Sequence, residues 1–163
     1  MIRAALLLLT LTQATQADTP LPPAESWTMT PFPGLAVTGS LDPARVFIGP
    51  PDGETWSIDF WTRSFAVHPS PNGEYVLISP AGGNLLGWSG DPDESVLWLY
   101  QAPGGEEIAT VPLRALIDPR DMERTVSHYV WITSYTWSEN GWRFDTPDGQ
   151  AWHLSTDLRL SRR

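Results

Sequence analysis

The sequence predicts an all-β, antiparallel fold: a meander or sandwich of short hairpins in a single domain. Two observations carry this prediction. Runs rich in valine, isoleucine, threonine and aromatic residues recur along the chain, and short turn sequences that end in glycine separate them. The turns lie at residues 51–53, 71–73, 103–105, 140–141 and 147–149. The strands expected from this pattern cover residues 45–49, 55–60, 64–68, 74–79, 95–101, 106–111, 128–137, 142–146 and 150–155.

Composition excludes several other classes. The chain has 163 residues, a formal net charge of −9 and no cysteine, so it is not a disulfide-stapled scaffold. A hydrophobic content of 41%, which includes nine tryptophans, argues against a disordered chain. Nucleic-acid binding needs a basic face, and the acidic balance of the chain opposes it.

The first 17 residues predict a secretory signal peptide. Arg3 precedes an apolar stretch over residues 4–11, and small residues surround the expected cleavage point before Asp18. The apolar stretch is too short to cross a bilayer, which takes about 20 residues. We therefore expect a periplasmic or secreted protein without a membrane span, whose mature chain begins near Asp18.

Residues 18–34 are expected to form a proline-rich extended arm, followed by a single all-β domain over residues 35–163. The arm contains five of the sixteen prolines, and proline favours extended backbone and donates no hydrogen bond to a neighbouring strand. Trp27 and Phe32 are expected to fix this arm to the domain.

The last three expected strands can be placed in register. A two-residue turn at 140–141 would pair Trp137 with Phe144, and a three-residue loop at 147–149 would pair Phe144 with Trp152. One face then carries Trp131, Tyr135, Trp137, Trp142, Phe144, Trp152 and Leu154. The other face carries Ser138, Arg143, Asp145, Ala151 and His153. A three-residue loop at 51–53 likewise pairs Ile48 with Trp56.

Residues 65–79, followed by 96–100, resemble a blade of a TolB-type or WD40-type β-propeller, in which a turn like Ser70 to Gly73 joins two inner strands. Residues 145–154 resemble part of a second blade. WD40 blades recur every 40–45 residues or so, and a closed ring needs at least four of them. Asn72 and Asn140 lie 68 residues apart, which does not fit this spacing, so the resemblance implies a meander or sandwich of blade-like hairpins.

Three tryptophans are candidates for a binding surface. Trp88 lies in the glycine- and aspartate-rich stretch 80–93, which is expected to be a surface loop. Trp61 and Trp27 adjoin segments with weak pairing signals. Trp56, Trp131, Trp137 and Trp152 are expected instead to pack in the core, because each has apolar neighbours on the predicted inner face.

Arg143, Asp145 and His153 form the best polar cluster that the register predicts, and its simpler interpretation is the solvated face of a half-buried sheet. The sequence contains no recognisable catalytic set. The spacing of its histidines is wrong for a metal site, and we expect no metal or other cofactor.

The leading hypothesis is therefore an exported, non-enzymatic domain that binds another macromolecule, such as a protein of the cell envelope. A carbohydrate-binding module that uses exposed tryptophans is the alternative. A hydrolase with a carboxylate site is the third hypothesis.

Overall fold

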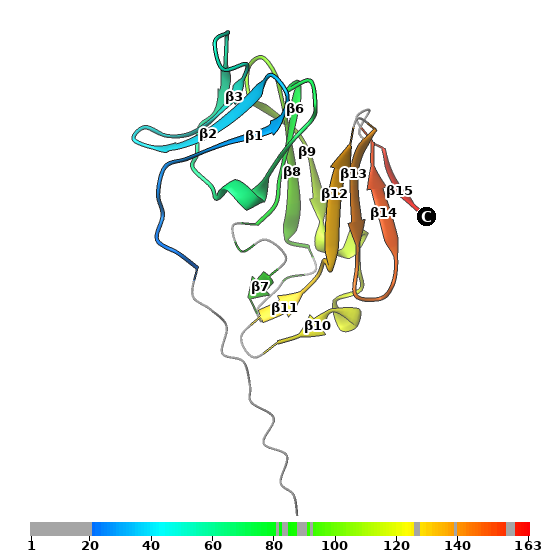
Figure 1. Cartoon of the computed structure of the whole chain (residues 1–163). Coiled ribbons are helices and arrows are strands. Elements are labelled where there is room, and N and C mark those ends of the chain that lie inside the picture. The colour runs from blue at the N-terminus through cyan, green and yellow to red at the C-terminus, as the bar shows by residue number, and fades with distance from the viewer. Residues whose placement is uncertain are drawn as a thin grey trace, which may run out of the picture.

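The computed structural model describes residues 21–80, 82, 85–87, 91, 93–125, 128–138, 140–155 and 159–163. Within these ranges the chain forms β-strands and three short 3-10 helices, and every strand pair is antiparallel (Figure 1). The prediction of an all-β, antiparallel fold is confirmed.

The strands form four sheets. The N-terminal sheet has the order β1 (Trp27–Phe32), β2 (Leu35–Leu41), β3 (Ala44–Gly49), β4 (Trp56–Ile58). The central sheet has the order β5 (Val67–Pro69), β6 (Tyr75–Ile78), β8 (Ser95–Gln101), β9 (Glu106–Pro112). The C-terminal sheet has the order β12 (Ser134–Ser138), β13 (Gly141–Asp145), β14 (Ala151–Leu154), β15 (Leu160–Arg162). A small sheet has the order β10 (Glu123–Arg124), β11 (His128–Val130), β7 (Leu85–Gly87).

The three 3-10 helices connect these strands. They are η1 (Ser64–Ala66), η2 (Leu113–Ala115) and η3 (Pro119–Asp121). The first leads into β5, and the other two follow β9.

The central sheet is covered on both faces, because side chains of successive residues in a strand point to opposite sides. Val76 and Ile78 of β6 pack with the N-terminal sheet in one buried cluster. Leu77, between them, packs with Trp142 and Phe144 of the C-terminal sheet in a second cluster. The three four-stranded sheets therefore form successive layers, as Figure 1 shows.

Most of the predicted register is confirmed. Phe144 pairs with Trp152 across β13 and β14, and Ile48 pairs with Trp56 across β3 and β4. The pairing of Trp137 with Phe144 is wrong by two residues, since Trp137 pairs with Trp142. Gly141 is a strand residue paired with Ser138 rather than the second residue of the turn. A shift of two residues does not exchange the two faces of a strand.

Part of the expected arm belongs to the N-terminal sheet. β1 begins at Trp27 and pairs with β2 as an edge strand, with a register shift between Met29 and Phe32. Pro31 falls in that shift, where a missing backbone donor costs no regular ladder hydrogen bond. The extended backbone was expected there, whereas the pairing was not.

Other strands also depart from expectation. The predicted strand 128–137 divides into β11 and β12, which lie in different sheets. The strands β2, β7, β10 and β15 were not predicted, and β7 lies in the expected loop. Tyr135 lies on the expected inner face, where its ring meets that of His68, but it is 40% exposed because β12 is an edge strand.

Candidate functional site

Two of the three tryptophans expected at a binding surface fasten the N-terminal segment. The indole Nε1 of Trp27 donates to the carbonyl of Thr62 at 2.8 Å, and that of Trp61 donates to the carbonyl of Glu25 at 3.2 Å. Both tryptophans are half-buried. Both hydrogen bonds join the same two segments, so they hold the chain before β2 against the chain after β4. Trp88 lies outside the described residues.

The expected polar cluster does not converge on one point. Arg143 pairs in register with His153, as predicted. The His153 ring, however, forms a hydrogen bond with the carbonyl of Asn140 at 2.9 Å, and the Asp145 carboxylate accepts one from Ser134. Neither hydrogen bond involves Arg143. The arrangement matches the solvated outer face of a sheet better than a reaction centre.

A buried histidine lies between the central and C-terminal sheets. His68 is only 4% exposed, its Nε2 lies 3.3 Å from the hydroxyl of Ser79, and its ring meets that of Tyr135 edge-on. Burial lowers the pKa of His68 to about 4. The adjoining cavity of about 10 Å³ suffices for about one water molecule, and its described lining contains no carboxylate. The cavity leaves no room beside the pair for a molecule larger than water.

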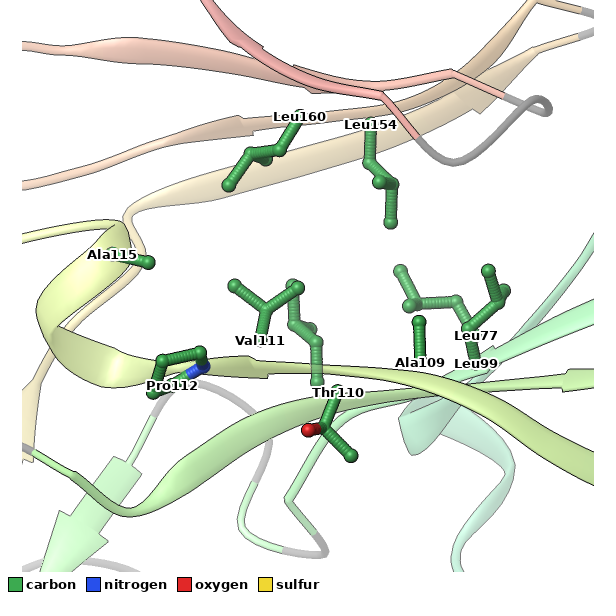
Figure 2. Close-up of a pocket in the computed structure, with 10 residues that line it drawn as sticks. Leu77, Leu99, Ala109, Thr110, Val111, Pro112, Ala115, Leu154 and Leu160 are labelled. Carbon is green, nitrogen blue, oxygen red and sulfur yellow. The ribbon is translucent and has the colours of Figure 1, made fainter.

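A larger apolar crevice separates the same two sheets farther along (Figure 2). It has a volume of about 240 Å³. Figure 2 shows Leu154 and Leu160 pointing from the C-terminal sheet toward Val111 of β9, while Thr110 points away. The lining consists of Leu77, Leu97, Leu99, Ala109, Thr110, Val111, Pro112, Ala115, Leu154 and Leu160.

Both walls of this crevice end in an edge strand. β9 is the last strand of the central sheet, and β15 is the last strand of the C-terminal sheet, among the residues that the structure describes. One backbone edge of each strand therefore has no ladder partner in those sheets. An edge strand with free N–H and C=O groups is a template on which another chain can pair.

A polar hollow of about 330 Å³ adjoins the crevice at Ala115, which lines both. Arg114 and Arg162 line it together with three aspartates. One of these, Asp118, accepts hydrogen bonds from Arg120, which hold its pKa at about 2. A ligand that leaves the apolar crevice at this end would thus meet charges of both signs.

A third cavity, the groove beside β4, lies between that strand and the turn that joins β8 to β9. It has a volume of about 480 Å³, and Trp56, Phe60 and Tyr100 all line it. The rings of Phe60 and Tyr100 have centroids 5.8 Å apart and are inclined at 55°. Burial, followed by the charge of Glu107 and its hydrogen bond, raises the pKa of Tyr100 to about 12.

No protein family, curated protein or solved structure matched this chain. Within the described residues, no three histidine, aspartate or glutamate side chains gather closely enough to hold a metal ion. No helix in that part of the chain is long and apolar enough to cross a membrane.

The sequence did not single out the crevice or the groove beside β4. The strand 106–111 was expected, but its position at the edge of a sheet depends on which strands pair. Leu160 lies in an unpredicted strand of three residues. Trp56 was expected in the core, and it is half-buried beside the groove. A strand that pairs on one side only marks the edge of a sheet, and turn sequences do not show which strands pair in this way.

Proposed function

We propose that this chain is an exported, non-enzymatic binding domain that receives an extended segment of another protein in the cell envelope. The segment lies along β9 and places an apolar side chain in the crevice between the central and C-terminal sheets. The observation that carries the proposal is the combination of an apolar crevice with edge strands on both of its walls.

Strand addition supplies affinity and selectivity through different groups. Main-chain hydrogen bonds to a free sheet edge provide affinity for any extended chain, and pockets for alternate side chains provide selectivity. β9 is seven residues long, which is enough for a short added strand. The crevice is large enough for one bulky apolar side chain. Burying such a side chain contributes about 1.5–3 kcal/mol, or roughly a tenfold to hundredfold change in Kd.

Charge indicates which partner this edge prefers. β9 begins with Glu106 and Glu107, both exposed, and the whole chain carries a formal charge of −9. The net negative charge of the chain opposes the approach of a second copy. A basic segment would instead gain favourable contacts, so the preferred ligand alternates basic and apolar side chains.

Export and the blade-like architecture belong to the same proposal. The apolar stretch within residues 1–17 supports export through the Sec pathway. The layers of three four-stranded antiparallel sheets support the resemblance to propeller blades without a closed ring.

The test uses a seven-residue peptide, matched to the length of β9, in which lysine alternates with valine and a central leucine. Binding is followed by isothermal titration calorimetry. We expect the wild-type chain to bind this peptide and to lose at least tenfold in affinity when serine replaces the central leucine. A peptide with glutamate in place of lysine should bind more weakly still.

Ala115→Trp blocks the crevice with little risk to folding, because Ala115 is exposed at its mouth. Ala44→Trp is the matched control, since Ala44 is an exposed alanine of the N-terminal sheet. We expect the first variant to abolish peptide binding and the second to preserve it. Equal binding by both variants would refute the proposed site.

A further inference from the structure

The groove beside β4 has features that the proposed peptide site does not use. It lies between β4, the last strand of the N-terminal sheet, and the β8–β9 turn, whereas the crevice separates the central and C-terminal sheets. Its volume of about 480 Å³ is twice that of the crevice, and its lining mixes aromatic rings with exposed backbone and a carboxylate. A site of this composition suits a ligand that has both apolar faces and many hydroxyl groups.

The aromatic side chains are held in fixed positions. The indole Nε1 of Trp56 donates to the carbonyl of Gly73 at 2.9 Å, which fixes the ring against the central sheet. Tyr100 packs against Phe60, and its hydroxyl donates to Glu107 at 3.3 Å. Rings held in this way lose little conformational entropy when a ligand stacks on them.

The opposite wall of the groove depends on a glycine. Gly105 has φ +67°, and a Cβ at this position would lie 2.1 Å from the carbonyl oxygen of Ser57. The turn that begins at Ala102 can therefore approach β4 this closely only because residue 105 lacks a side chain. The close approach fixes the width of the groove between Trp56 and the turn.

Polar groups complete the groove. The Asp59 side chain is 79% exposed and lies 3.1 Å from Arg45 in an ion pair. The carboxylate accepts hydrogen bonds and the guanidinium donates them, so together they offer both kinds of partner to a hydroxyl pair. Asp52 and Glu54 lie on the exposed loop that leads into β4. The carboxylates around the groove disfavour an anionic ligand.

We propose that the groove lined by Trp56, Phe60 and Tyr100 binds a neutral saccharide chain, with sugar rings stacked on the aromatic side chains and hydroxyl groups bound to Asp59. Carbohydrate rings present flat C–H faces that fit aromatic rings, and their hydroxyls suit charged acceptors at the rim. This inference is independent of the peptide site, and the domain would hold glycan at one place and protein at another.

The experiment titrates the full chain with neutral oligosaccharides and follows binding by isothermal titration calorimetry and by the fluorescence of tryptophan. The probes are hexamers of β-1,4-linked glucose, α-1,4-linked glucose and β-1,4-linked N-acetylglucosamine. Oligogalacturonate serves as the anionic probe. We expect one of the neutral hexamers to bind with a Kd below millimolar and oligogalacturonate to bind at least tenfold more weakly.

Two matched pairs of variants locate the site. Asp59→Asn removes the charged acceptor from an exposed side chain and is expected to weaken binding about fivefold to tenfold, whereas Asp52→Asn on the neighbouring loop is expected to have no effect. Phe60→Leu is expected to weaken binding at least tenfold, whereas Trp61→Leu is expected to leave it unchanged.

Thermal unfolding of each variant shows whether the fold is intact. Failure of every neutral hexamer to bind the wild-type chain would overturn the proposal. Tighter binding of oligogalacturonate, or loss of binding in the control variants alone, would overturn it as well. None of these results alters the expected effect of Ala115→Trp on peptide binding, so the two proposals fail separately.

Discussion

His68 is expected to make the stability of this protein depend on pH between about 4 and 6.5. The side chain is buried between the central and C-terminal sheets, and its pKa is lowered to about 4 from the usual 6.5 because burial disfavours the charged ring. In the unfolded chain the ring regains its usual pKa. Below pH 6.5 the unfolded state therefore binds a proton that the folded state does not bind.

The sign and size of the effect follow from this difference. Stability rises with pH wherever the unfolded state holds more protons, so the folded state loses stability as the pH falls from 6.5 toward 4. At about 1.4 kcal/mol for each pKa unit, the full interval corresponds to roughly 3 kcal/mol. Below about pH 4 both states are protonated at this site, and the contribution becomes constant.

The assay is urea unfolding of wild type and His68→Gln at a series of pH values. Glutamine preserves a side chain that can bond with Ser79 but does not titrate. Carboxylates contribute equally to both proteins, so the difference between the two curves isolates His68. Between pH 6.5 and 4, we expect the free energy of unfolding of His68→Gln to fall by roughly 3 kcal/mol less than that of wild type. Parallel curves for wild type and His68→Gln would refute the reasoning.

Three further predictions concern packing, backbone geometry and export. Trp142→Phe removes the buried donor to the His68 carbonyl and should cost about 1–3 kcal/mol in urea unfolding, whereas an unchanged midpoint would show that this 3.0 Å hydrogen bond is dispensable. Gly105→Ala should lower the melting temperature more than Gly149→Ala, because both glycines have positive φ but only Gly105 faces a backbone atom within contact distance. Equal melting temperatures for the two variants would contradict the close approach of Gly105 to the Ser57 carbonyl. Mass spectrometry of the exported protein should find an N-terminus near Asp18, and recovery of only the uncleaved chain would contradict the signal peptide.

Turn chemistry explains which parts of the fold could be predicted from sequence. The loop at 147–149 determines how Phe144 meets Trp152, and the loop at 51–53 determines how Ile48 meets Trp56. These are local pairings, and the structure confirms them. The pairing near Gly141 was predicted two residues away from the observed one, because a shift of two residues does not change which faces are buried.

Long-range neighbours could not be predicted in the same way. Nothing local to β9 shows that it is the last strand of the central sheet or that β15 lies across from it. Trp27 and Trp61 were identified as aromatic side chains outside clear strands, but their hydrogen-bond partners lie about 35 residues away in sequence. Proline-rich composition likewise indicated an extended conformation at β1 and could not specify the strand with which it pairs.

Amide hydrogen exchange on the peptide complex tests the central claim most directly. With the basic alternating peptide bound, the account predicts slower exchange along β9 and unchanged exchange along β1 and β4, the edges of the N-terminal sheet. Protection confined to β1 or β4, or no protection at any edge strand, would contradict the claim that the crevice between the central and C-terminal sheets receives an added strand.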